Sequence, residues 1–256
     1  MHLKLPAGFV DFDRGTVRVI ATSLELEEMV GLLTGSTRDL PAEPGAASGA
    51  AGTRPAPAGA VVGGRGGTRR LVLAGGKVVY LRRYLRGGLA ARFVRDLYLL
   101  RPERPLRELV ITETARAAGC PVPTVLAVSI EEAGLFYRGW IVTEAIDGAS
   151  ALIDRYGPAG PGERAGLLRG VGAAFRSLHE AGVYHVDLTG HNVLIRVDGE
   201  LVIIDFDRGI LARPRTARLA GKGLDRFWRS MTKLCAARGE RLDDTERRWL
   251  ERGYER

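Results

Sequence analysis

The stretch from residue 183 to residue 209 constrains the fold more than any other part of this 256-residue chain. Two short apolar runs, 193–195 and 201–204, are joined by a loop with an Asp-Gly pair, the strongest two-residue signal for a β-hairpin. Asn192 precedes the first run and Asp205 follows the second. We therefore expect two antiparallel strands that bring Asn192 and Asp205 to the same end.

A third polar residue, Asp187, lies one loop before this hairpin. Phosphoryl transfer needs such a set, because one carboxylate orients the acceptor hydroxyl while an Asn and a second carboxylate hold magnesium on the phosphates. The order His-x-Asp-Leu-x-x-x-Asn followed by Asp-Phe matches the catalytic and metal loops of the protein-kinase fold. Alternatively, these residues only form turns and a strand end, where each is common alone. Their order, with a hairpin between, favours the kinase interpretation.

The composition is that of a globular protein with a basic surface. Hydrophobic residues make up 45% of the chain and charged residues 27%, both ordinary values for a chain that buries a core. The positively charged residues are nearly all arginine, and the net charge of +8 favours polyanionic partners. Cys120 and Cys235 have no metal-binding spacing, so we expect reduced, structural thiols. No apolar run is long enough to span a bilayer, and Asp11 and Asp13 interrupt any signal-like start, which predicts a cytoplasmic chain.

The first third of the chain predicts small elements around a low-complexity segment. We expect strands at 9–12 and 16–20, and a helix at 24–33 capped by Ser23. Residues 34–60 are rich in Gly, Ala, Pro, Ser and Thr and are predicted to be a flexible insertion.

A glycine-rich segment then leads into a second hairpin, with strands near 71–73 and 78–82. The backbone at Gly64 and Gly66 could approach phosphates. Glycines in hairpins more often serve only as turns, and the interpretation depends on their position upstream of the catalytic motif. Residues 85–101 are basic and read either as a solvated helix face or as a patch for an anionic surface.

The rest of the chain predicts a helix, two strands and then mainly helices. The expected helices are 103–118, 162–181, 223–238 and 243–252, and the expected strands are 122–130 and 135–146. Glu144 and Ile146 lie where a kinase chain crosses between lobes and contacts adenine. We predict an α+β, bilobal, protein-kinase-like fold, with a β-rich N-lobe at 1–146 and a reduced, mostly helical C-lobe at 147–256.

The motifs also resemble a particular family, the lipopolysaccharide core kinases. The resemblance is carried by residues 185–194 and 204–209, by 81–88, and by Arg107-Glu108 followed by 119–123. It runs from about residue 61 to the C-terminus.

The resemblance implies that Asp187 is the catalytic base and that Asn192 and Asp205 are magnesium ligands. It also implies that Arg82 holds a phosphate of ATP and that Glu108 is the helix-αC glutamate of the nucleotide site. The implied acceptor is a hydroxyl of 3-deoxy-D-manno-octulosonic acid (Kdo) on lipid A. We therefore expect ATP and Mg²⁺ as cofactors and peripheral contact with the cytoplasmic face of the anionic inner membrane. We expect a monomer that does not bind nucleic acid.

Some residues depart from protein kinases. Arg82 stands where protein kinases have their phosphate-binding lysine, and Arg83 or Lys77 could take that role instead. Val186 replaces the arginine of regulated kinases, which argues against control by an activation-loop phosphate. Alternatives on the same fold are a heptose kinase, a small-molecule phosphotransferase or an atypical protein kinase. An inactive nucleotide-binding scaffold has only the missing lysine in its favour.

Overall fold

The computed structural model describes residues 4–35, 68–85, 97–99 and 104–255. The chain divides into two compact units. The first comprises residues 1–110 and 124–145, and the second comprises 111–123 and 146–256. The structure has the mixed α and β content that the sequence predicts.

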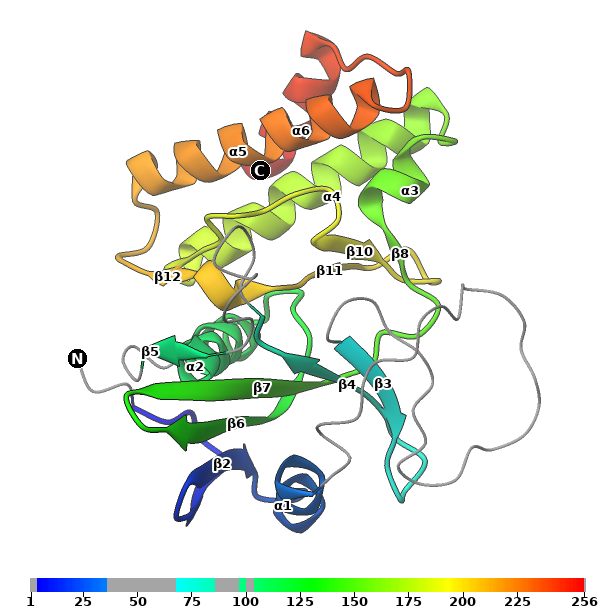
Figure 1. Ribbon diagram of the computed structural model, residues 1–256. Coiled ribbons are helices and arrows are strands. Elements are labelled where there is room, and N and C mark those ends of the chain that lie inside the picture. Colours follow the sequence, from blue (N-terminus) through cyan, green and yellow to red (C-terminus); the bar gives the residue numbers. More distant parts are fainter. Residues whose placement is uncertain (1–3, 36–67, 86–96, 100–103, 256) are drawn as a thin grey trace. The chain divides into compact units, whose positions relative to one another are not determined.

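The first unit is built on one seven-stranded antiparallel sheet (Figure 1). Its strands run in the order β1-β2-β6-β7-β4-β3, with the short β5 paired to β7. The bounds are β1 Phe9–Arg14, β2 Val17–Thr22, β3 Thr68–Val72, β4 Val78–Arg83, β5 Tyr98–Leu99, β6 Val125–Ala133 and β7 Phe136–Glu144. The predicted hairpin around Gly75-Gly76 is confirmed as β3 and β4, and Gly76 takes the positive φ of 79° that its turn requires.

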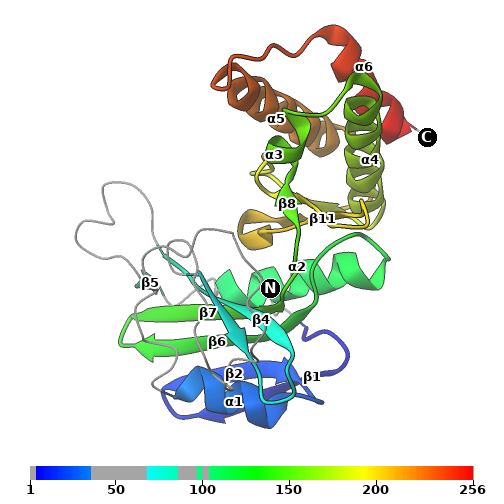
Figure 2. The ribbon, with the colours of Figure 1, turned by 90° about the vertical axis from the view of Figure 1, so that its right-hand side faces the viewer.

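Helix α1, Leu26–Thr34, packs on this sheet against β2 (Figures 1 and 2). Its buried Met29 and Leu33 join Trp140 and Leu81 in the apolar core of the unit. The predicted cap at Ser23 is wrong, because the helix begins after Glu25. The Ser23 amide instead donates to the carbonyl of Gly8, so Ser23 belongs to the end of the β1–β2 pair.

The second unit contains most of the helices. They are α3 Leu152–Tyr156, α4 Pro161–Glu180, α5 Ala217–Ala236 and α6 Asp244–Glu255. Its strands are short: β8 Ser150–Ala151, β9 Val183–Tyr184, β10 Val193–Ile195, β11 Leu201–Ile203 and β12 Ile210–Leu211, with the 3₁₀ turn η3 at Phe206–Arg208. Helix α2, Arg104–Ala117, contributes residues up to Val110 to the first unit and the rest to the second.

Helices α4 and α6 approach each other through glycine (Figure 2). A Cβ atom on Gly253 would lie 2.0 Å from the Arg169 carbonyl oxygen, and one on Gly172 would lie 2.1 Å from that of Leu250. Only glycine permits this backbone separation, so both positions fix how α6 packs.

Helix α5 begins at Ala217, six residues before the predicted start at 223. Its buried residues include Phe227 and Met231, and its opposite face carries most of its lysine and arginine side chains. Among the described residues, no helix is both long and apolar enough to cross a membrane.

Candidate active site

The hairpin expected between Asn192 and Asp205 is confirmed. Strands β10 and β11 pair antiparallel, with Val193 opposite Ile203. The Ile204 amide donates to the Asn192 carbonyl at 2.9 Å, which extends the pairing by one residue. Asn192 and Asp205 therefore stand at the same end of two neighbouring strands.

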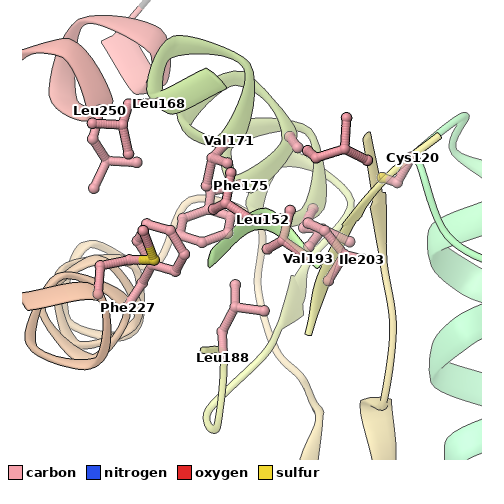
Figure 3. Packing of buried hydrophobic residues seen from close by; sticks show 14 of the residues in the cluster. Cys120, Leu152, Leu168, Val171, Phe175, Leu188, Val193, Ile203, Phe227 and Leu250 are labelled. Carbon is pink, nitrogen blue, oxygen red and sulfur yellow. The ribbon is translucent and has the colours of Figure 1, made fainter. Parts of the chain in front are cut away.

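A buried apolar side chain anchors the loop before this hairpin. Leu188 is buried and points from the loop toward Phe175 of α4 and Phe227 of α5 (Figure 3). Gly190 allows the loop to lie close to α5, because a Cβ there would be 2.5 Å from the Met231 sulfur. The neighbouring Asp187 therefore lies in a loop that is packed against the core, and its own side chain is about 40% exposed.

His185 braces this loop against the end of β11. Its Nε2 lies 3.1 Å from the Ile204 carbonyl oxygen, and the Asp187 amide donates to its Nδ1 at 3.3 Å. Burial lowers the pKa of His185 below its usual value, although the Ile204 carbonyl and nearby Asp205 oppose that shift. A neutral ring that donates from Nε2 and accepts at Nδ1 satisfies both contacts.

Two arginines hold the Asp187 carboxylate. Arg226 of α5 donates from Nη2 to Oδ1 at 2.6 Å, and Arg208 of η3 lies 3.5 Å from Oδ2. Both arginines are more exposed than the carboxylate that they contact, so the carboxylate remains accessible to a ligand. Asp187 is thus oriented by charge rather than buried.

Asn192 and Asp205 have the donor chemistry of a magnesium site. The Asn192 side-chain nitrogen donates to the Asp187 carbonyl at 3.3 Å, which leaves its oxygen to face a ligand. Asp205 is exposed and has a left-handed backbone, with φ of 70°, a costly conformation that clusters at functional sites.

The described residues contain no group of three or more His, Cys, Asp or Glu that could hold a metal alone. Magnesium usually takes one or two carboxylates and completes its shell with substrate phosphates and water. One carboxylate and one amide oxygen fit an ion that arrives with a nucleotide.

In the first unit, Arg82 rather than Arg83 pairs with the predicted glutamate. Arg82 Nη2 lies 2.6 Å and 2.7 Å from the two oxygens of Glu108, which also accepts a hydrogen bond from the Tyr84 hydroxyl. Side chains alternate along β4, so Arg83 points to the other face and stacks over the Trp140 ring at 5.3 Å. The geometry favours Arg82 for the role that the phosphate-binding lysine has in protein kinases.

Lys77, the other candidate, bridges two carboxylates. Its ammonium group lies 2.6 Å from both Glu25 and Glu144. These partners raise the pKa of Lys77 against the opposing effect of partial burial. Lys77 therefore ties α1 to the end of β7, which is a structural task.

The remaining predicted positions are less informative. Glu144 ends β7, and its amide donates to the Thr124 carbonyl at 3.0 Å. Ile146 follows two residues later and is the first residue of its segment of the second unit. Gly64 and Gly66 lie outside the described residues, as does nearly all of the predicted insertion at 34–60.

Residues 57–254 match the family model described as the lipopolysaccharide kinase (Kdo/WaaP) family. That match spans well over half of the chain. The chain belongs to this family.

Curated relatives agree with this assignment. A 3-deoxy-D-manno-octulosonic acid kinase of Stenotrophomonas maltophilia is 39% identical over 184 residues, which is 68% of this chain and 70% of the relative. Proteins of the same name from Xanthomonas oryzae and Xanthomonas euvesicatoria are 38% and 36% identical, each covering 75% of this chain and 77% of the relative.

Within this member of the lipopolysaccharide kinase family, the sequence reasoning missed three side chains of the site. Arg208 directly follows Asp-Phe-Asp, and its position beside the metal loop could have suggested a partner for Asp187. Arg226 and Tyr84 had no local signal. Arg226 of α5 meets Asp187, and Tyr84, the residue after β4, meets Glu108, only through tertiary packing.

Proposed function

We propose that this chain transfers the terminal phosphoryl group of ATP to a hydroxyl of Kdo in a lipid A-linked lipopolysaccharide precursor. Membership of the lipopolysaccharide kinase family and the names of the curated relatives support this function. The observation that carries it is the placement of Asp187, Asn192 and Asp205 around one hairpin, in the order phosphoryl transfer needs.

Asp187 accepts the acceptor proton in this proposal. The hydroxyl hydrogen-bonds to the carboxylate, and its oxygen forms a bond to the γ-phosphorus while the bond to the bridging oxygen breaks and ADP leaves. The proton passes to Asp187 as the attacking oxygen donates its electron pair to phosphorus and the hydroxyl becomes more acidic. Arg226 and Arg208 keep the carboxylate oriented between turnovers. Positioning of this kind supplies much of the rate gain in phosphoryl transfer.

Asn192 and Asp205 would hold Mg²⁺. When bound, the ion neutralises negative charge on the phosphates of the nucleotide. Asn192 suits this task because the hydrogen bond to the Asp187 carbonyl fixes its amide orientation.

Arg82, which lies in the first unit, would hold a phosphate of the nucleotide. Its guanidinium is fixed by Glu108 and lies 4.9 Å from the centre of the Tyr84 ring, so its orientation is set before any ligand arrives. A planar fork offers a phosphate two parallel hydrogen bonds where lysine offers a point charge. We also propose that Gly64 and Gly66 approach the phosphates, and that the backbone near Glu144 and Ile146 contacts adenine.

The lipid-linked acceptor implies contact with the cytoplasmic face of the inner membrane. The net charge of +8 supports peripheral attraction to anionic lipid. We propose a monomer that binds neither DNA nor RNA.

The direct test is phosphorylation of Kdo-lipid A. Purified protein is incubated with ATP, Mg²⁺ and Kdo-lipid A, and the product is examined by mass spectrometry. We expect one added phosphate that fragmentation places on the Kdo residue. Phosphate transfer to a heptose or to a soluble alcohol, with none to Kdo, would contradict the proposed acceptor.

A further inference from the structure

A cavity of about 480 Å³ opens in the second unit beside the loop that carries Asp187. One wall comes from that loop and the neighbouring β12, and the other comes from α5. Its lining includes His185, Val186, Ile210, Lys222, Arg226 and Arg229.

The α5 wall of this cavity carries three cations. Lys222, Arg226 and Arg229 are spaced by four and three residues, so they lie on one face of the helix. All three are exposed. Within the described part of the chain, the side chains of Lys222 and Arg229 have neither an ion pair nor a hydrogen bond, whereas Arg226 contacts Asp187.

The other polar groups around the cavity do not offset this charge. Burial lowers the pKa of His179 to about 4, so this ring is neutral at physiological pH. The carboxylate of Asp225 lies 3.1 Å from Arg247 of α6. The cavity is therefore electropositive.

The cavity is also close to the reacting group. Val186 lines it, and the next residue is Asp187, whose Oδ1 lies 2.6 Å from Arg226. A molecule whose hydroxyl meets Asp187 would extend along this wall, where Lys222 and Arg229 could meet a negative charge on it.

We propose that this cavity is the acceptor subsite, in which Lys222 and Arg229 bind the carboxylate of the acidic sugar. The inference rests on the proposed function, which supplies an acceptor with a carboxylate on the sugar that is phosphorylated. Arginine and lysine recognise carboxylates through charge-assisted hydrogen bonds, and these are about twice as strong as neutral ones. Binding the carboxylate here fixes which hydroxyl of the sugar reaches Asp187.

The same helix provides matched controls. Arg218 and Lys233 continue the basic face of α5 at its two ends and are exposed, but neither lines the cavity. Arg218→Gln and Lys233→Gln therefore remove the same charges as Arg229→Gln and Lys222→Gln without touching the subsite. Arg226 is left unchanged because it contacts Asp187, and its loss would mix orientation of the base with acceptor binding.

The test measures steady-state phosphorylation with two acceptors, Kdo-lipid A and the methyl ester of its Kdo carboxylate. We expect Lys222→Gln and Arg229→Gln each to raise KM for Kdo-lipid A about tenfold or more, since a hydrogen bond to a charged group contributes about 1.5–3 kcal/mol. KM for ATP and the melting temperature should stay at wild-type values, and the two control variants should match wild type.

The ester separates carboxylate recognition from general attraction to an anionic lipid. For wild type, KM for the ester should exceed KM for the free acid by about tenfold or more. The Lys222→Gln, Arg229→Gln double variant should have the same KM for both acceptors. The inference is wrong if the double variant still prefers the free acid, or if the control variants lose as much as the cavity variants. Failure of the wild-type protein to phosphorylate Kdo-lipid A would instead overturn the proposed function, and this inference with it.

Discussion

Asp187 is the residue on which the proposed reaction depends most. Asp187→Asn keeps the size of the side chain and removes its ability to accept a proton. General-base catalysis contributes about 10²–10⁴-fold, so we expect kcat to fall by that factor while KM for ATP changes little. Steady-state kinetics measures both.

Asp198→Asn is the matched control for that substitution. Asp198 lies in the turn of the same hairpin, and its side chain accepts a hydrogen bond from the Glu200 amide that asparagine can also accept. Its activity should equal wild type. Retention of more than a tenth of wild-type kcat by Asp187→Asn would remove Asp187 from the catalytic role.

Glu108 links stability and nucleotide binding in the first unit. Its buried carboxylate is shared by Arg82 and Tyr84, so Glu108→Ala leaves a cation and a hydroxyl without this partner. Loss of one member of a buried pair costs about 3–5 kcal/mol. We expect a lower melting temperature and a raised KM for ATP.

Arg82→Lys separates these two effects. A lysine retains the charge beside Glu108 but loses the fork, so stability should fall less than in Glu108→Ala while KM for ATP still rises. A variant with an unchanged KM for ATP would show that the guanidinium does not hold phosphate.

The sequence alone could not choose between Arg82 and Arg83, because the choice depends on which sheet face meets Glu108.

At the scale of elements, the crossing of α4 and α6 is fixed by backbone proximity. Gly253→Ala would place a methyl group 2.0 Å from the Arg169 carbonyl oxygen, so the helices must separate. Overpacking of this kind costs about 1–3 kcal/mol. Chemical denaturation should show a loss of that size, although alanine favours helix.

Gly166→Ala provides the contrast on the partner helix. Gly166 is exposed in α4, and no atom lies within 4 Å of an added Cβ. There the gain in helix propensity acts alone and should stabilise the protein by about 1 kcal/mol. Equal effects at both positions would mean that the close crossing does not determine stability.

The elements that the sequence predicted well are those with strong local patterns. The β10–β11 hairpin follows from two apolar runs and a turn, and α4 follows from its apolar spacing. Strands β8, β9 and β12 were missed because two residues carry no periodicity. Each exists only through its partner, as when Ile210 pairs with Tyr184. The early start of α5 was missed because its first turns are mostly exposed, with only Ala220 buried, and so show no apolar spacing.

At the scale of the whole molecule, chain order and spatial grouping differ. The predicted lobe boundary at residue 146 remains a prediction, whereas residues 111–123 are grouped with the later half of the chain. The Pro121 carbonyl accepts a hydrogen bond from the Ile203 amide, and Ile111 packs beside Gly209. No local sequence pattern predicts such contacts, because each joins segments about 80 residues or more apart in the chain.

Acid should weaken the second unit through its buried histidines. The His179 ring stacks on Tyr184, and its Nδ1 lies 3.0 Å from the Tyr254 hydroxyl. Burial lowers the pKa of His179 from 6.5 to about 4. The unfolded chain therefore binds more protons between these values, so the stability is fully present above about pH 6.5 and is lost as the pH falls toward 4.

Between roughly pH 7.5 and pH 5, the melting temperature of wild type should fall more steeply than that of His179→Gln, because a buried neutral histidine becomes charged on acid unfolding. Glutamine retains a hydrogen-bonding group for Tyr254 and does not titrate. His191→Gln is the control, because His191 is exposed in the loop before β10 and its loss should leave the wild-type slope unchanged. Calorimetric scans across the pH series decide the matter: parallel curves for wild type and His179→Gln would mean that proton uptake at this ring does not govern the acid sensitivity of the unit.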